Sequence, residues 1–235
     1  IQAQVVNIEK KRQEKKETGL QGFIGLDLDY TKNNSELLQA KTKGQLQYFR
    51  GKITFLLFDE FTQVKADQKS YLNDGFFHLR YNYHLVKKNL VTAEVFTQYQ
   101  YNRIKNLKHR YLVGAGPRLK IFDTTKSNLY IGPLVMYEYE ILTGDSIKNE
   151  QFRLSAYLSF KLDLGKVVKF THITYYQPNL GKFSDYRLSS ESVLDFKVTK
   201  GLYFNVSYNL SYDSEPPDEV EKLFYTLSNG IKFKF

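Results

Sequence analysis

The stretch Leu202–Asp213, LYFNVSYNLSYD, alternates between two kinds of side chain. Apolar and aromatic residues fall at even positions, and from position 205 onward the odd positions hold only Asn, Ser and Asp. Because successive side chains of a strand point to opposite faces, this period of two predicts a β-strand with one apolar and one polar face. The stretch is longer than the ~5–6 residues of a typical soluble strand and matches the ~9–11 residues of a tilted bilayer-crossing strand.

The same period recurs from Gly19 to the end of the chain. We predict strands at 19–30, 37–49, 52–64, 71–83, 90–102, 110–122, 128–140, 151–162, 167–177, 186–198, 202–213 and 223–235. The third is the least regular, since both faces of 53–61 are apolar. In hydrocarbon each unpaired backbone N–H or C=O costs several kcal/mol, so a spanning sheet must have no free edge. The predicted fold is therefore all-β, a closed antiparallel transmembrane β-barrel of about twelve strands over 19–235.

The composition of the 235 residues agrees with a barrel. The chain holds 19 Tyr and 18 Phe but no Trp or Cys, and aromatic residues favour strands. No stretch approaches the ~18 consecutive apolar residues of a helical membrane span. A soluble β-sandwich or lipocalin-like barrel is the alternative, and the length and number of the predicted strands argue against it. The net charge of +9 is scattered rather than clustered, so we expect no nucleic-acid partner.

The connections and termini indicate an orientation. Links after the second, eighth and tenth strands are short, whereas those after odd-numbered strands, such as 141–150 and 214–222, are generally longer and more polar. Short periplasmic turns and longer outer loops are typical of bacterial barrels, and an even strand number places both termini in the periplasm. Residues 1–18 are predicted to be a charged periplasmic segment, with 1–3 either a signal-peptide remnant or an arbitrary start. Phe235 ends the last strand as a terminal aromatic residue.

Several stretches together resemble a known family. They are EVFTQYQY (94–101), RYLVGAGPR (110–118), LVMYEYE (134–140), RLSAYL (153–158), ITYYQP (173–178), SDYR (184–187) and YTLSNGIKFKF (225–235). They look like the salt-induced outer-membrane protein family, whose domain function is unknown. The resemblance implies a barrel in the outer membrane of a Gram-negative bacterium, surrounded by outer-membrane lipid and lipopolysaccharide. It supplies no catalytic residues and no substrate.

Charged side chains on the predicted inner faces form the candidate site. The strands carrying them could meet across a narrow barrel, and the residues are Arg80, Glu94, Arg118, Glu138, Arg153, Arg187 and Glu191. They could form a constriction that selects small solutes, or an ion-pair network that fills the interior. About eight strands leave room only for side chains and about sixteen leave a water channel, so twelve is intermediate. We also expect Lys41, Arg118 and Glu94 to point inward, and Leu26, Phe204 and Leu210 to point outward.

Other chemistry is poorly supported. Gly114 and Gly116 in GAGPR lack the helix that a phosphate loop needs, and we interpret them as small inward residues that let a neighbouring side chain lie flat. No histidine, including His172, sits in a motif with a nucleophile and an oxyanion donor, so we predict no catalytic residues. No ligand spacing suggests a metal, and we expect no cofactor.

The sequence therefore predicts an outer-membrane barrel, and the leading hypothesis for its role is a narrow channel for ions or small polar solutes. The first alternative is a non-conducting structural or accessory subunit that binds an envelope protein through the charged segment 4–18. The second is a lipid-modifying barrel enzyme, for which His172 is the one residue that could be named.

Overall fold

The computed structural model describes residues 18–32, 36–66, 69–86, 89–104, 106–143, 148–165, 167–217 and 220–233. The predicted N-terminal segment, apart from Thr18, and Phe235 lie outside these ranges. In this part of the chain no helix has the length and hydropathy of a membrane span. The strands are β1 Gly19–Lys32, β2 Glu36–Arg50, β3 Ile53–Ala66, β4 Lys69–His84, β5 Val91–Asn102, β6 Leu107–Asp123, β7 Ser127–Leu142, β8 Lys148–Leu164, β9 Val168–Asn179, β10 Lys182–Lys197, β11 Leu202–Asp213 and β12 Leu223–Phe233.

All twelve predicted strands are confirmed, and each overlaps its predicted range. The largest difference is at β10, which begins at Lys182 rather than at residue 186. Strands such as β6 and β8 also begin earlier than predicted, because their ladders continue into polar sequence beyond the alternating stretch. The predicted difference in connection length is therefore small. β3 and β4 are joined through residues 67–68, and β9 and β10 through 180–181, so only 214–222 is a long connection.

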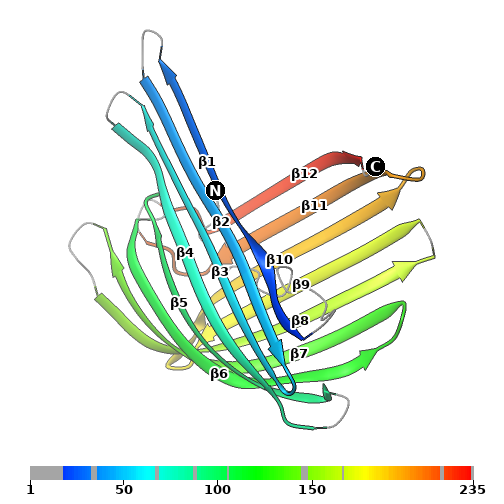
Figure 1. The fold of residues 1–235 in the computed structure, drawn as a ribbon. Coiled ribbons are helices and arrows are strands. Elements are labelled where there is room, and N and C mark those ends of the chain that lie inside the picture. The colour runs from blue at the N-terminus through cyan, green and yellow to red at the C-terminus, as the bar shows by residue number, and fades with distance from the viewer. Residues whose placement is uncertain are drawn as a thin grey trace.

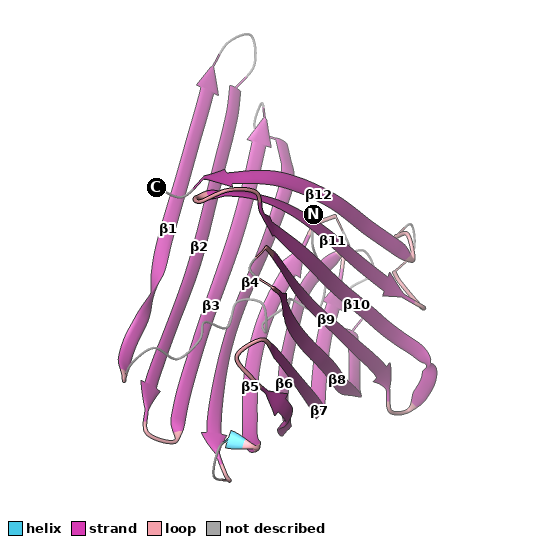
Figure 2. Cartoon of the chain, turned by 90° about the vertical axis from the view of Figure 1, so that its right-hand side faces the viewer, coloured by secondary structure: helices cyan, strands magenta, loops and turns pink. Residues whose placement is uncertain are grey.

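The strands form one antiparallel sheet in which each strand pairs with its neighbours in chain order, from β1 to β12 (Figure 1). The sheet curls strongly, so that the later strands face the earlier ones across its concave side (Figure 2). We call the region that the concave face encloses the hollow. β1 and β12 are its edges and do not pair with each other. The all-β antiparallel prediction is confirmed, but the sheet is open in this structure rather than closed into a barrel. The two edges diverge in direction because each strand is rotated relative to its neighbour, and this twist accumulates across the sheet (Figure 1).

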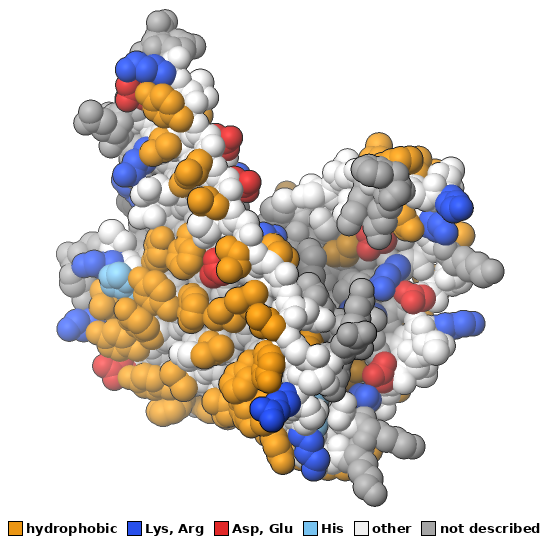
Figure 3. All heavy atoms as spheres, in the orientation of Figure 1, with side chains coloured by type: hydrophobic (Ala, Val, Ile, Leu, Met, Phe, Trp, Pro, Cys, Tyr) orange, Lys and Arg blue, Asp and Glu red, His pale blue; other side chains and the backbone are white. Residues whose placement is uncertain are grey.

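The two faces of the sheet have opposite chemistry. On the convex face, apolar side chains are highly exposed, as with Ile24 at 74% and Ile231 at 77%. Figure 3 shows hydrophobic side chains gathered over the strands on the left of Figure 1. Among the described residues, twenty-one buried polar or charged side chains outnumber twelve large buried hydrophobic ones. Soluble proteins bury apolar and expose charged residues, so this distribution is inverted.

The six orientation predictions fall on the expected faces. Glu94 and Arg118 are buried on the concave face, while Leu26 and Phe204 are exposed on the convex face. Leu210 lies on the convex face and is half-buried. Lys41 is the partial exception. It shares the concave face with the buried Gln45 and Gln47, but its side chain is exposed, because β2 lies beside the open edge of the sheet.

The irregular third strand has a simple explanation. Leu56 and Phe58 point to the concave face and are fully buried in a small cluster with Phe76. Phe55, in contrast, lies on the convex face and is exposed. Both faces of β3 are therefore apolar because one packs inside the sheet and the other belongs to the outer apolar surface.

Gly114 confirms the interpretation of the GAGPR segment as structural. A Cβ built at Gly114 would lie 2.5 Å from Cε1 of Phe96, the neighbouring ring on β5. That ring cannot easily move aside, because it stacks on His78 with ring centroids 5.4 Å apart. The glycine is needed for the space it leaves rather than for phosphate binding.

We expect Gly114→Val to destabilise the protein by about 1–3 kcal/mol, because the new side chain overpacks the site occupied by Phe96. The measurement is the chemical-denaturation midpoint of the protein in detergent micelles. Ala115→Val, on the convex face of the same strand, is the matched control and should shift the midpoint little. Equal midpoints for the two variants would contradict the packing at Gly114.

Candidate functional site

The most concentrated charge on the concave face surrounds Glu138 of β7. Its Oε1 lies 3.3 Å from Nε of Arg153 on β8, and its Oε2 lies 2.7 Å from Nη1 of Arg187 on β10. Nε of Arg110 on β6 is 3.6 Å from the same Oε2. Gln151 donates a further hydrogen bond to Oε1 at 2.6 Å. One fully buried carboxylate thus holds three arginines from three different strands.

Further carboxylates complete this group, which we call the Glu138 cluster. Asp185 accepts two hydrogen bonds from Nη2 of Arg153, at 2.9 and 2.8 Å. Glu140 lies 2.6 Å from Nη2 of Arg110. Asp213 lies 3.0 Å from Nε of Arg187. The cluster comprises Arg110, Glu138, Glu140, Arg153, Asp185, Arg187 and Asp213.

Burial makes the pairing in this cluster necessary. The side chain of Arg153 is only 2% exposed, and an unpaired charge at that depth would carry a desolvation penalty of several kcal/mol. The ladders run β7–β8–β9–β10, so the Arg187–Glu138 pair joins strands separated by two others. Direct contact across that distance shows that the hollow is narrow here.

A second group, the Glu94 cluster, lies nearer the end of the sheet where β1 begins. Glu94 on β5 lies 3.1 Å from Nη1 of Arg80 on β4 and accepts a 2.9 Å hydrogen bond from the hydroxyl of Tyr157 on β8. Arg118 on β6 donates to the same hydroxyl oxygen at 3.2 Å. Nε of Arg80 donates to Nε2 of His78 at 3.3 Å. Tyr157 therefore spans the hollow between β8 and β5.

Little space remains between the two clusters. The cavity there measures about 30 Å³ and is bounded by Arg80, Arg110, Glu138 and Arg187, together with apolar side chains such as Met136. That volume suits about one or two water molecules. At this level the side chains of β4 to β10 leave little space between the two clusters.

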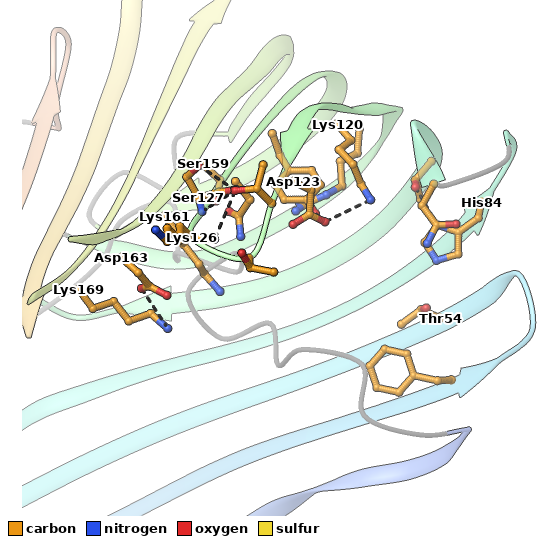
Figure 4. Close-up of a pocket in the computed structure, with 18 residues that line it drawn as sticks. Thr54, His84, Lys120, Asp123, Lys126, Ser127, Ser159, Lys161, Asp163 and Lys169 are labelled. Carbon is orange, nitrogen blue, oxygen red and sulfur yellow. Dashed lines mark hydrogen bonds and ion pairs between the residues drawn. The ribbon is translucent and has the colours of Figure 1, made fainter. Parts of the chain in front are cut away.

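A larger cavity, which we call the vestibule, opens beside the Glu94 cluster (Figure 4). Its volume is about 480 Å³, and Arg118 lines it as well as belonging to the Glu94 cluster. Lysines from β6 to β9 lie along one wall, and Thr54 of β3 and His84 of β4 lie across from them (Figure 4). The vestibule is thus wide and polar, whereas the space at the Glu94 cluster behind it is narrow.

The structure brings six of the seven predicted site residues into the two clusters. Arg80, Glu94 and Arg118 join one, and Glu138, Arg153 and Arg187 join the other. Glu191 lies elsewhere on the concave face, half-buried between Ile173 and Asn209. The action of the predicted site residues as a constriction stays a prediction.

Sequence reasoning missed several members of the clusters. They are Arg110, Asp185, Asp213 and Tyr157. Arg110 and Asp185 lie at or before the predicted strand starts, so their faces were uncertain. The sequence did carry a signal for Tyr157, namely Gly132 inside the neighbouring predicted strand, since such a glycine often marks a close approach. In the structure the ring of Tyr157 lies over Gly132, where a Cβ would have no room.

His172 lies on the convex face, away from both clusters. Its Nδ1 is 2.8 Å from Oγ of Ser192, and its Nε2 is 2.9 Å from Oγ1 of Thr174. The surrounding backbone belongs to the β8–β9 and β9–β10 ladders. His84 and His109 lie within strands, because β4 extends to His84 and β6 begins at Leu107. Across the described ranges, no group of three or more His, Asp or Glu side chains could hold a metal ion.

The family model described as "Protein of unknown function, DUF481" matches residues 24–235, and the chain belongs to that family. This description does not include the salt-induced name, which stays a prediction. No curated protein matches the sequence.

Three solved structures show weak similarity. The NanC porin is 11% identical with a TM-score of 0.47, covering 90% of this chain and all of its own. The KdgM porin is 12% identical with a TM-score of 0.42, covering 88% of this chain and 98% of its own. A bacterial polysaccharide outer membrane secretin is 8% identical with a TM-score of 0.47, covering 86% and 84%. Similarity at these levels carries no conclusion about function.

Arg153→Met should destabilise the protein by about 3–5 kcal/mol, because it leaves the carboxylates of Asp185 and Glu138 without this partner. The double variant Arg153→Met/Asp185→Leu should recover part of the loss. Lys32→Met is the control, since Lys32 and Glu36 form an exposed pair expected to contribute under about 1 kcal/mol. Denaturation midpoints in micelles provide the measurement, and an Arg153→Met effect as small as that of the control would refute the buried network.

Proposed function

We propose that this protein is a bacterial outer-membrane β-barrel with a narrow, charge-lined interior. The single observation that carries the proposal is the inverted side-chain distribution, with apolar residues exposed on the convex face and charged residues buried on the concave one. An exposed apolar surface of this extent would aggregate in water, whereas hydrocarbon would solvate it. Outer-membrane lipid and lipopolysaccharide would then be the partners of the convex face.

The proposal includes closure of the sheet. In the membrane, β1 would pair with β12, since an open edge leaves backbone groups unsatisfied in hydrocarbon. Both strands carry exposed apolar residues on the convex face, such as Leu26 and Leu227, which suits a continuous apolar belt across the junction. The end where β1 begins and β12 ends, which includes the vestibule, would face the periplasm.

Within that barrel we infer a restricted passage for ions or small polar solutes. The vestibule supplies a polar entrance, and the Glu94 and Glu138 clusters would set the narrowest points, as rings of charged side chains do in pores. Both signs of charge are present at these points, so they would disfavour large solutes more than they distinguish anions from cations.

A non-conducting barrel is the second candidate. It is favoured by the cavity between the clusters, whose volume of about 30 Å³ suits little more than one or two water molecules. Such a barrel would act as a structural or accessory subunit that binds another envelope protein. Electrical conductance separates the two candidates directly.

We expect the purified protein to give small, discrete openings in planar lipid bilayers, and Arg187→Ala to enlarge them. Arg187 reaches across the hollow to Glu138, so its removal opens space while leaving Glu138 its contacts with Arg153 and Arg110. The control is Arg103→Ala, an exposed residue in the β5–β6 connection, which should leave the openings unchanged.

Silence from both the wild-type protein and Arg187→Ala, with insertion verified by protease protection, would contradict the passage and support the non-conducting candidate. Openings of equal size in the two proteins would instead show that the Glu138 cluster does not limit conduction.

A further inference from the structure

The vestibule has a strong excess of positive charge. Five cationic side chains line it, Arg118, Lys120, Lys126, Lys161 and Lys169, against two carboxylates. A polar cavity lined by one dominant sign of charge attracts ions of the opposite sign and raises their local concentration. The Glu138 cluster, in contrast, contains nearly equal numbers of cations and anions.

The two carboxylates are already engaged. Asp123 lies 3.2 Å from Nζ of Lys120, and Asp163 lies 4.0 Å from Nζ of Lys169 (Figure 4). Within the described part of the chain, no carboxylate lies within 4.0 Å of Lys126 or of Lys161. These two ammonium groups therefore remain available to an anion entering the cavity.

The rest of the lining is suited to a hydrated, oxygen-rich ligand. Thr92 and Ser159 are buried there, and Ser127 and Asn128 add a hydroxyl and an amide. At the inner limit, the guanidinium of Arg118 lies 3.9 Å from the ring centroid of Tyr130 and is hydrogen-bonded to Tyr157. A guanidinium held in a fixed plane suits the paired oxygens of a carboxylate or phosphate.

We propose that the vestibule binds a small anionic solute bearing carboxylate or phosphate groups, with Lys126 and Lys161 as the primary charge contacts. A free solute is favoured over a lipid headgroup, because the vestibule lies on the concave face, away from the exposed apolar surface. This inference rests on the proposed function in placing the binding site at the entrance of the passage. Arg118 lines the vestibule, and it connects the bound anion to Glu94 through the hydroxyl of Tyr157.

The test is isothermal titration calorimetry on the full chain in a non-ionic detergent, with citrate and inorganic phosphate as separate probes at constant ionic strength. The wild-type protein should bind at least one of them. The double variant Lys126→Gln/Lys161→Gln should weaken that affinity by roughly fivefold or more, as expected for the loss of two partly screened ion pairs. The single variant Lys161→Arg, which keeps the positive charge and leaves Lys126 unchanged, should retain the wild-type affinity.

Lys148→Gln is the matched control, because Lys148 is exposed at the opposite end of the same strand, β8. The affinity of the Lys148→Gln variant for the probe should equal that of the wild-type protein. Absence of binding by the wild-type protein, or equal affinity in the double variant and the control, would overturn the inference. Calorimetry needs no conduction, so a silent bilayer recording combined with citrate binding would refute the passage but not the anion site.

Discussion

A sheet can lie in hydrocarbon only if its backbone is fully hydrogen-bonded and its outward side chains are apolar. This constraint accounts for the main features of the structure. Twelve long strands pair in order, the highly exposed apolar side chains lie on the convex face, and the buried charged side chains lie on the concave face. Under the proposed function, the same constraint would require β1 to pair with β12, the two edges of the sheet in this structure. Both the proposed membrane location and the proposed enclosed interior would depend on that closure.

The polar interior creates a second problem, because charges removed from water must be paired. In the Glu138 cluster, carboxylates are shared among arginines from three strands, and in the Glu94 cluster the carboxylate of Glu94 is paired with Arg80 and with the hydroxyl of Tyr157. These contacts also narrow the hollow. The vestibule differs, since it is open and holds more cations than anions. Stability thus favours balanced charge at depth, while the entrance can carry an excess of one sign.

Much of the fold could be predicted from the period of two alone. In β11, the alternation of Leu202–Asp213 fixed both the strand and its faces, and the six site residues found in the clusters followed from the same parity. Strand ends were harder, because polar residues such as Asp185, which lies at the register shift between Lys182 and Tyr186, extend a strand without any apolar signal. Contacts across the hollow, such as that of Tyr157 with Glu94, depend on the curvature of the whole sheet and cannot be derived from any single strand.

The most direct test of this account is disulfide cross-linking of the two edge strands in outer membranes. The chain has no cysteine, so introduced pairs report without background. Leu26→Cys on β1 would be combined in turn with Tyr225→Cys, Leu227→Cys or Asn229→Cys on β12. Paired strands hold opposite Cα atoms about 4.5–5.5 Å apart, within disulfide range. The account predicts efficient intramolecular cross-linking in one of these registers and none between Leu26→Cys and Leu210→Cys on β11. Membrane-inserted protein that cross-links in no register of β12 would contradict it.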